Sequence, residues 1–429
     1  MTTPRRTSRS DRPGIQRGTF GVGEAEEYLL RLELFGMRFG LDRMRRLTTA
    51  LGSPERSFEA IHVVGTNGKS STVRMAEALL ARHGRAAGSY TSPHLVSFAE
   101  RISARGAQIG PDAFAGAVQR AARAAEAVNR TLPADDGVTQ FELLTAAAYL
   151  ALAEAGVEVA VIEAGLGGRW DATNTLDSRV QVLTNVGLDH TRWLGPTVRD
   201  IAREKLAVVR DGATLVVGDL HPDALEEAVA AAAQHDVRLV RAAPRDVSAP
   251  GAFQRWNFGV ATAAVQAFLG RLDPAAVSAA AATVSVPGRC EVVGFDPLTI
   301  VDGAHNPAGI AALVASVPEM LGGRRPVAVV SILEDKDAAG MLRELLPSSC
   351  AVVFTSNANP RALSPATLES LARQVTPDPP PIEREPDPRA AVARARALAG
   401  PDGGVLATGS IYLVADLARG ESRRRASTL

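Results

Sequence analysis

Residues Ile61–Ser71 have the sequence IHVVGTNGKSS. The first four residues form a β-branched run of strand length, and Gly65 and Gly68 then favour a tight turn before an apolar-periodic segment of helical length at Ser70–Arg82. A glycine turn between a strand and a helix lets backbone N–H groups and the helix N-terminus bind phosphate, and Lys69 adds a positive charge there. The stretch therefore predicts a phosphate-binding loop.

The loop departs from the usual Walker A pattern, which requires a glycine where this chain has Val63. The chain therefore has a shortened GxxGKS motif. Because so short a motif also occurs by chance, the alternative interpretation is a glycine turn that binds no ligand. We expect Ser70 or Ser71 to face a metal ion. The remainder of the chain has to decide between the two interpretations.

Strand and helix signals alternate along most of the chain, which is typical of parallel sheets covered by helices. We predict strands at Ile61–Val64, Val157–Ile162, Val180–Val186, Thr214–Val217, Leu298–Val301, Val327–Ile332, Ala351–Phe354 and Val405–Ala407. We predict helices at Ser70–Arg82, Phe141–Ala155, Val198–Val209 and Ala308–Val317. The fold class is α/β, with a larger N-terminal and a smaller C-terminal domain.

The Arg-rich stretch 1–18 lacks an apolar core and predicts a disordered tail. An Ala-rich segment ends near Pro287–Gly288 and a new strand–loop–helix series follows, so we place the two domains at 19–287 and 288–429. Thr376–Pro388 carries six prolines among acidic residues and predicts a surface loop.

Composition excludes several classes of function. Lys+Arg and Asp+Glu both number 47, so no overall basic field favours nucleic acid. Cys290 and Cys350 form no CxxC pair, which argues against a disulfide framework or a cysteine zinc site and favours the reduced cytoplasm. Apolar runs fall short of the roughly 20 residues of a membrane span, so we expect no membrane association and a monomer.

Ten blocks in order resemble the bacterial dihydrofolate synthase/folylpolyglutamate synthase branch of the Mur ligase superfamily. They are GTNGKSS at 65–71, YTSPHLVSFAERI at 90–102, FELLTAAAYL at 141–150, IEAGLGGRWDATNTL at 162–176, TNVGLDHTRWLG at 184–195, REKLAVVR at 203–210, PGRCEVV at 287–293, VDGAHNP at 301–307, EDKD at 334–337 and ATGSIYLVADLAR at 407–419. The resemblance covers nearly the whole chain after the tail.

The resemblance implies an N-terminal P-loop ATPase-type domain, a C-terminal Rossmann-like domain and an active site in the cleft between them. It implies an ATP- and Mg²⁺-dependent ligase that joins L-glutamate to a pterin carboxylate or to reduced folates through an acyl phosphate. It also implies a carbamylated Lys205 and a monovalent cation. Phe253 and Phe258 stand where the family commonly has His and Ala, which bears on adenine contacts and substrate range.

The resemblance assigns residues to roles. Nucleotide contacts fall on Gly65, Thr66, Asn67, Gly68, Lys69, Ser70, Ser71, Asn257, Arg289, Asp302 and His305. Metal ligands fall on Ser70, Ser92, Glu163 and His190, which suit magnesium because all but the imidazole supply oxygen. Catalytic roles fall on Lys69, His190, Lys205 and Arg289, and substrate contacts on Pro93, His94, Phe141, Glu142, Ser331 and Lys336.

Ordinary structural roles compete with several of these assignments. Lys205 could instead be an exposed helix lysine paired with Asp200 or Glu204, and Arg289 could form an interdomain salt bridge. The Asp335–Asp337 cluster has the chemistry of a helix N-cap.

Other functions for the whole chain are a non-catalytic ATP-binding protein, a P-loop kinase, and a Mur-type ligase acting on a non-folate carboxylate. Because Gly65 lies near the beginning of the chain, we expect no added UDP-binding domain of the kind that peptidoglycan-precursor ligases carry.

Overall fold

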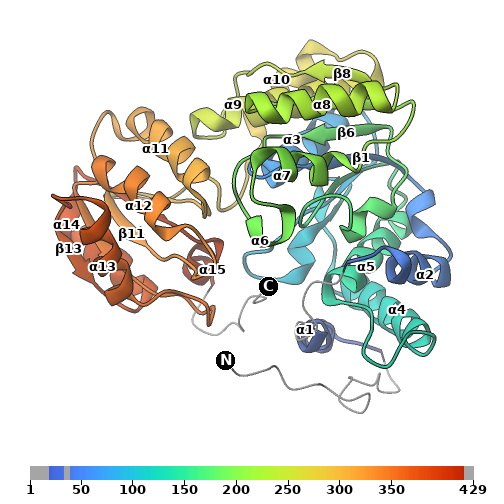
Figure 1. Cartoon of the computed structure of the whole chain (residues 1–429), viewed down its shortest axis with the longest axis horizontal. Coiled ribbons are helices and arrows are strands. Elements are labelled where there is room, and N and C mark those ends of the chain that lie inside the picture. The colour runs from blue at the N-terminus through green and yellow to red at the C-terminus, as the bar shows by residue number, and fades with distance from the viewer. Residues whose placement is uncertain (1–18, 33–38, 420–429) are drawn as a thin grey trace.

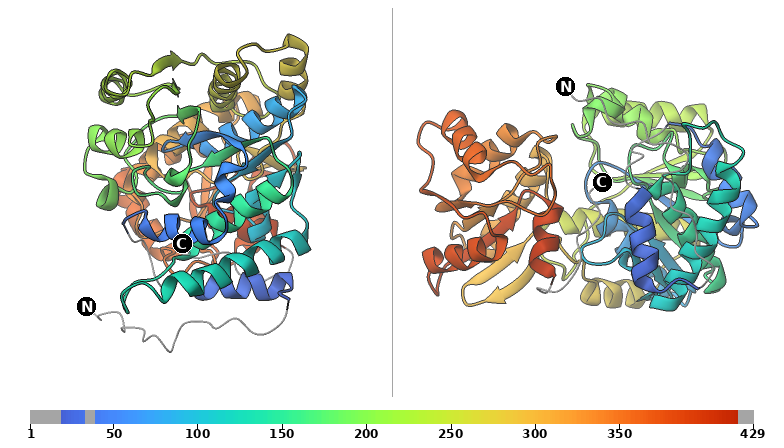
Figure 2. Two further views of the ribbon diagram at one scale, coloured as in Figure 1. Left: turned by 90° about the vertical axis from the view of Figure 1, so that its right-hand side faces the viewer. Right: turned by 90° about the horizontal axis from the view of Figure 1, so that it is seen from below.

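A computed structural model describes residues 19–32 and 39–419. Within these ranges the chain forms two α/β bodies that lie side by side, each built around one sheet (Figure 1). Figure 2 shows the same two bodies from the side and from below. The predicted tail at 1–18 lies outside the described residues. The α/β class and the division into a larger and a smaller sheet are confirmed.

The first body contains eight strands. They are β1 (Glu59–Val64), β2 (Ala87–Tyr90), β3 (Ile102–Ala104), β4 (Ala107–Gln108), β5 (Val159–Glu163), β6 (Val180–Leu183), β7 (Thr214–Val217) and β8 (Arg238–Arg241). Its helices are α1 (Val22–Leu32), α2 (Asp42–Ala50), η3 (Pro54–Arg56), α3 (Lys69–Arg82), η4 (Phe98–Arg101), α4 (Pro111–Asn129), α5 (Gln140–Glu154), η5 (Ala172–Thr175), α6 (Thr191–Leu194), α7 (Val198–Leu206), α8 (Pro222–Gln234), α9 (Ala252–Leu269) and α10 (Pro274–Thr283).

The strand order of the first sheet is β4-β3-β2-β5-β1-β6-β7-β8. The pairs from β2 to β8 are parallel, as predicted, whereas β3 and β4 pair antiparallel at one edge. The predicted strand Val180–Val186 is too long, because β6 ends at Leu183 and the chain turns toward the phosphate loop. The central strands β5, β1 and β6 bring three carboxyl ends together at one edge, where ligands bind in α/β sheets.

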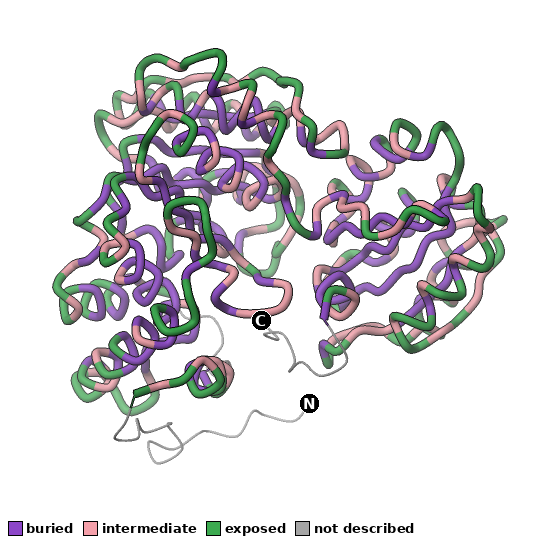
Figure 3. The backbone as a smooth tube through the Cα atoms, turned by 180° about the vertical axis from the view of Figure 1, so that it is seen from behind, coloured by how far each residue is buried: buried purple, intermediate pink, exposed green. Residues whose placement is uncertain are grey.

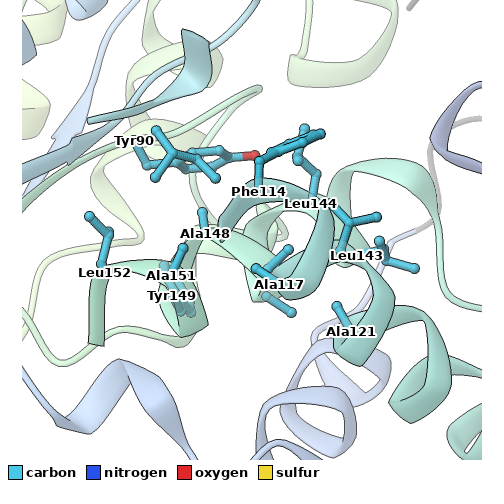
Figure 4. Close-up of a cluster of buried hydrophobic side chains, with 14 of the residues drawn as sticks. Tyr90, Phe114, Ala117, Ala121, Leu143, Leu144, Ala148, Tyr149, Ala151 and Leu152 are labelled. Carbon is cyan, nitrogen blue, oxygen red and sulfur yellow. The ribbon is translucent and has the colours of Figure 1, made fainter. Parts of the chain in front are cut away.

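Alternating side chains of the first sheet bury its two faces. Ile61 and Val63 of β1 pack with helices α3, α9 and α10, whereas Ala60 faces the cluster that includes α4 and α5. Figure 4 shows that second cluster, in which Tyr90 of β2 meets Phe114 of α4 and Leu144 of α5. Helices α7 and α8 pack against Leu183 of β6 and against Leu215 and Val217 of β7. Both faces of the central strands are therefore dry, which fits their nearly continuous apolar sequences.

The second body contains six strands. They are β9 (Glu291–Phe295), β10 (Leu298–Val301), β11 (Val327–Val330), β12 (Ala351–Phe354), β13 (Ile382–Arg384) and β14 (Gly404–Thr408). Its helices are α11 (Pro307–Leu321), α12 (Ala338–Leu345), η6 (Leu346–Ser348), α13 (Pro365–Val375), α14 (Pro388–Ala399) and α15 (Ile411–Ala418).

The strand order of the second sheet is β13-β12-β11-β14-β10-β9, with only β9 antiparallel. Helices α11, α12 and α13 cover one face, and α14 and α15 cover the other. Buried residues accordingly concentrate in the middle of each body (Figure 3). The prediction that Thr376–Pro388 is only a surface loop is wrong, because Ile382–Arg384 pairs with β12 as edge strand β13. Proline is tolerated there because an edge strand leaves some N–H groups unpaired.

His62 in the middle of β1 is a buried histidine that should make the stability of the fold depend on pH. Its Nε2 lies 2.8 Å from Thr173 Oγ1 and the residue is 1% exposed. Burial, with a smaller effect of Arg210, lowers the pKa of His62 to about 3. The unfolded chain therefore binds a proton that the folded chain refuses between about pH 6.5 and 3, so stability must fall as pH drops through this window.

We expect the stability gap between the wild type and His62→Gln to be constant above pH 7. Below pH 6.5 the wild type should lose about 1.4 kcal/mol more per pH unit than the variant, because glutamine binds no proton. Urea unfolding at several pH values measures this difference. Parallel stability curves down to pH 4 would exclude His62 as a source of acid sensitivity.

Candidate active site

The phosphate loop joins β1 to α3, and two glycines permit its path. Gly65 has φ +154°, and a Cβ there would lie 1.8 Å from Thr184 Oγ1. Gly68 has φ +78°, precedes the first residue of α3, and would place a Cβ 2.2 Å from Asn257 Oδ1. Both positions require glycine because the backbone is left-handed and neighbouring side chains approach closely. The N-terminus of α3 thus opens onto the loop, as predicted.

Residues at the carboxyl end of β6 hold the loop in this shape. Asn185 accepts the Thr66 N–H through its backbone oxygen at 3.0 Å and the Asn67 N–H through its side-chain Oδ1 at 2.8 Å. Thr184 Oγ1 donates to the Asn67 carbonyl at 2.7 Å. These contacts fix the loop backbone before any ligand arrives, which is the preorganisation that phosphate binding needs.

Lys69 is the first residue of α3 and is partly buried. Its Nζ donates to the Thr66 carbonyl at 3.1 Å. Burial lowers the pKa of Lys69, while the carboxylates of Glu163 and Asp189 oppose that effect. An ammonium held at a helix N-terminus is suited to receive phosphate oxygens.

Two of the other three predicted metal positions, Ser70 and Ser92, contact the buried carboxylate of Glu163, the last residue of β5. Ser70 Oγ donates to Glu163 Oε1 at 3.0 Å, and the Ser92 N–H donates to Oε2 at 3.1 Å. Burial raises the pKa of Glu163, and Lys69 is the main group that opposes the rise. A hydroxyl and a carboxylate beside a phosphate loop fit Mg²⁺, which prefers oxygen ligands and keeps several waters.

Ser70 rather than Ser71 faces this carboxylate. Ser71 is 1% exposed, and its Oγ has no hydrogen-bond partner among the residues that the structure describes. In the same described ranges, no group of three or more His, Cys, Asp or Glu side chains forms a metal cluster.

His190 has a left-handed backbone (φ 51°) just before α6, and it faces the second body. Its Nε2 lies 3.3 Å from Lys336 Nζ. Burial lowers the pKa of His190 to about 4, although Asp189 opposes the effect. The lowered pKa favours the neutral imidazole, which is the form that can coordinate a metal.

Lys205 on α7 is buried, so the alternative of an exposed lysine paired with an acid is wrong. Glu204 pairs with Arg169 at 2.8 Å, and Asp200 caps the N-terminus of α7 through Thr197. Lys205 Nζ instead donates to the carbonyl of Gly65 at 2.8 Å. Burial, with Lys69 as the second cause, lowers the pKa of Lys205 to about 7.

The second body presents polar groups from the loop that follows β10. Asp302 is buried and accepts the N–H groups of Cys290 and Ala304, both at 2.7 Å. Burial raises its pKa, and Arg289 opposes this rise most. Arg289 Nη1 donates to the Gly288 carbonyl at 3.3 Å and lies so close to Gly303 that a Cβ there would be 2.2 Å from it. Among the described residues no salt bridge to Arg289 corresponds to the alternative of an interdomain ion pair, but its charge acts on Lys69 and Glu163 of the first body.

Asp189 is the residue that sequence reasoning missed. Its carboxylate accepts from Lys336 Nζ at 2.7 Å and from Asn306 Nδ2 at 3.1 Å, and His305 Nε2 lies 3.5 Å away. Although burial alone would raise its pKa, His305, His190 and Lys336 together lower the pKa of Asp189 below its usual range. Its position before His190 was the available signal, but the second-body partners are more than 100 residues away in sequence.

The two bodies also meet at the phosphate loop itself. Asn67 and Asn306 exchange side-chain amide hydrogen bonds of 3.2 and 3.0 Å. Asn306 caps α11 by accepting the Gly309 N–H, so that helix N-terminus is fastened beside the loop. Asn257 of α9 donates to Gln254 Oε1 at 2.9 Å and turns its Oδ1 toward Gly68. Asn67, Gly68 and Asn257, three predicted nucleotide residues of the first domain, therefore lie close to one another, and Asn306 of the second body joins them at the loop.

Four of the predicted substrate residues lie in the first body and two lie in the second. Phe141 lies with its ring against Gly165, and Pro93 is exposed, whereas His94 is buried and accepts from Arg101 Nε at 3.0 Å. Glu142 is engaged in structure: it completes the N-terminal capping box of α5 and pairs with Arg43 at 3.1 Å.

In the second body, Ser331 is buried and accepts from Asn357 Nδ2 at 2.9 Å. Asp337 caps α12, which confirms the capping interpretation for that residue, and α12 begins only at Ala338. Lys336, just before the cap, instead points to the first body, where it meets Asp189.

A phosphate loop in one α/β body, faced by cationic and polar loops of a second body, defines an ATP-dependent ligase of the Mur type. The family model described as "Mur ligase, glutamate ligase domain" matches residues 288–411. The chain belongs to the dihydrofolate synthase/folylpolyglutamate synthase family. The enzyme of that name from Mycobacterium tuberculosis is 36% identical over 375 residues, 77% of this chain and 76% of that protein. The Bacillus subtilis enzyme is 31% identical over 418 residues, 89% of this chain and 95% of that protein.

Solved structures agree over the full fold. The Mycobacterium tuberculosis folylpolyglutamate synthase complexed with ADP superposes with a TM-score of 0.84 at 34% identity, covering 93% of this chain and 100% of that chain. The Escherichia coli FolC in complex with DHPP and ADP gives 0.82 at 28%, covering 92% and 96%. The Yersinia pestis enzyme complexed with AMPPNP and a Mn ion gives 0.81 at 28%, covering 94% and 98%.

Proposed function

We propose that this ligase joins L-glutamate to the carboxylate of dihydropteroate and also extends reduced folates with glutamate, using ATP and Mg²⁺. The observation that carries the proposal is the convergence of the phosphate loop, Glu163 and Lys205 in the first body with Arg289, Asp302 and Lys336 in the second. The relatives' names and their complexes with ADP, DHPP and AMPPNP support the choice of substrates.

The chemistry has two steps. A carboxylate oxygen of the pterin acid attacks the γ-phosphorus of ATP, which breaks the bond to ADP and yields an acyl phosphate. The neutral amine of glutamate then attacks the acyl carbon, and inorganic phosphate leaves as the amide forms and the amine loses its proton. Because both steps move negative charge, catalysis depends on positioning and charge neutralisation.

Each cationic side chain has a distinct place in these steps. Lys69 and the N-terminus of α3 neutralise the phosphates of ATP, and Arg289 approaches the transferred phosphoryl group from the second body. Lys336 receives a carboxylate of the incoming glutamate. Ser70, Ser92, Glu163 and His190 would hold Mg²⁺, which supplies charge neutralisation when bound.

We also propose domains at 19–287 and 288–429, a carbamylated Lys205, a monovalent cation as a further cofactor, and action as a monomer in the cytoplasm. None of the helices in 19–32 and 39–419 is both long and apolar enough to cross a membrane. The low pKa of Lys205 supports the carbamate, because only a neutral amine reacts with carbon dioxide.

The function is tested by the substrate dependence of ADP release. With ATP, Mg²⁺, L-glutamate and dihydropteroate we expect sustained release of ADP and phosphate with one amide per ADP, and the same with tetrahydrofolate as acid. Omitting glutamate should stop the reaction after about one turnover, because the acyl phosphate has no amine to meet. Sustained turnover without an amine would indicate a kinase or ATPase, and turnover only with a non-folate acid would indicate a different Mur-type ligase.

Arg289→Ala should lower the rate of acyl-phosphate formation about 100-fold while ATP binding changes little, because its contact forms with the transferring group. Rapid-quench measurement of acyl phosphate, together with nucleotide titration, separates the two effects. A normal phosphorylation rate with weakened ATP binding would assign Arg289 to ground-state binding alone.

A further inference from the structure

Asp189 joins the two bodies at the active site through one carboxylate. It belongs to the loop after β6, yet its partners Lys336, Asn306 and His305 belong to two separate loops of the second body. The Lys336 and Asp189 side chains are only 7% and 8% exposed. A buried pair that spans two bodies constrains their relative position, since removing one partner leaves an uncompensated charge.

The contact also fixes where Lys336 lies. Asp189 Oδ1 accepts both Lys336 Nζ at 2.7 Å and the backbone N–H of His190 at 2.9 Å. Lys336 is thereby placed 3.3 Å from the His190 imidazole. Asn306 extends the same connection to the phosphate loop through its amide exchange with Asn67. Asp189 therefore helps to position Lys336, the N-terminus of α11 and the phosphate loop relative to one another.

We propose that Asp189 is a positioning residue of the ligation reaction, which fastens the second body over the phosphate loop and aims Lys336 at the incoming amino acid. This proposal rests on the proposed role of Lys336. Asp189 touches neither ATP nor glutamate in this scheme and acts through Lys336 and Asn306. The amine of glutamate can reach the acyl phosphate only if the two bodies hold their groups in the correct relative position. Loss of the Asp189 contacts should therefore lower turnover more than nucleotide binding.

The chain offers a matched control. Arg255 of α9 and Glu319 of α11 also form an ion pair between the two bodies, with Nη2 and Oε1 2.6 Å apart, but their side chains are 39% and 58% exposed. Such an exposed pair contributes little. Glu319→Gln removes an interbody ion pair without touching the site, whereas Asp189→Asn removes the buried one while keeping the side-chain shape.

Kinetics should separate the two variants. We expect Asp189→Asn to lower kcat about tenfold or more and to raise the KM for glutamate, with the affinity for ATP unchanged, whereas Glu319→Gln behaves as the wild type. In a Lys336→Gln background, Asp189→Asn should lower kcat by a smaller factor than it does alone, because one of the two residues through which it acts is already gone while its contact with Asn306 remains. Multiplied effects in the double variant would mean that the two residues act independently and would overturn the proposal.

A distance measurement provides a readout that does not depend on turnover. Spin labels on Cys350, which is exposed, and on a cysteine introduced by Ala230→Cys on α8 report the separation of the two bodies. With ATP bound, the distribution should be narrow in the wild type and in Glu319→Gln and broader in Asp189→Asn. An unchanged distribution in folded Asp189→Asn contradicts the fastening role. A lower KM for glutamate in Asp189→Asn would instead show that Asp189 merely occupies Lys336 and is displaced by substrate.

The two proposals fail separately. If wild-type protein lacks ligase activity with folate acids, the proposed function fails, while the labelled distances still report whether Asp189 fastens the bodies. If Asp189→Asn proves unfolded by circular dichroism, Lys336→Gln breaks the same ion pair from the other side and should broaden the distance distribution equally.

Discussion

Lys69→Ala should lower turnover about 1000-fold while the protein stays folded, because the variant loses the cation that meets the phosphates of ATP. Within residues 19–32 and 39–419 the ammonium makes a single hydrogen bond, to the Thr66 carbonyl, and the residue is the first of α3, where alanine is accommodated without strain. Asn185 and Thr184 hold the loop backbone independently of the lysine. Removing the side chain therefore deletes charge and leaves the loop path in place.

Nucleotide binding and chemistry should both suffer in this variant. Burial lowers the pKa of Lys69, so the free enzyme holds this proton less firmly, and arriving phosphate anions would favour its uptake. We expect ATP titration to show weakened binding and rapid quench to show almost no acyl phosphate, with an unchanged circular dichroism spectrum and Tm. Lys69→Arg is a useful second variant, because it keeps the positive charge but moves it away from the position of the lysine ammonium. Wild-type turnover in folded Lys69→Ala would remove the phosphate loop from the mechanism.

The fold was predictable wherever local pattern and tertiary structure agree. The apolar runs of β1, β7, β10 and β12 begin or end within two residues of the predicted bounds, because strands buried on both faces need unbroken apolar sequence. The antiparallel edges were not predictable in this way. β3, β4 and β9 are short, partly exposed strands whose pairing depends on a neighbour that no local pattern specifies.

The candidate site shows the same division. Gly65, Gly68 and Lys69 lie between β1 and the start of α3 and Glu163 ends β5, so their meeting at one sheet edge was predictable. Asp189 was not, because its partners lie on the other body and the only local sign is its place before His190. Glu142 shows a different limit, because its place in a resembling block does not reveal that its carboxylate completes a helix cap and pairs with Arg43. The sequence does not reveal that Lys205 is buried, and only this burial excludes an exposed lysine paired with an acid.

Lys205→Ala should lower turnover about 100-fold, and Lys205→Arg should fail as well, if an anionic carbamate on this amine is part of the site. The structure gives a physical reason for the modification. Burial brings the pKa of Lys205 to about 7, so roughly half of the amine is neutral at pH 7 and can add carbon dioxide. The neutral fraction falls as pH drops below 7, so bicarbonate-dependent activation should be strong at pH 8 and weak at pH 6.

A purely structural role for Lys205 makes different predictions. Its Nζ supports the Gly65 carbonyl at 2.8 Å, so loss of that hydrogen bond alone could disturb the phosphate loop. Lys205→Arg keeps donors near that carbonyl but forms no carbamate, whereas Lys205→Ala opens space in which acetate can place an anionic oxygen. Partial rescue of Lys205→Ala by acetate, no rescue of Lys205→Arg, and a carbon-13 carbamate signal from labelled bicarbonate in the wild type would together establish the carbamate. Full activity of Lys205→Arg, with no carbamate signal in the wild type, would leave Lys205 only its hydrogen bond to Gly65.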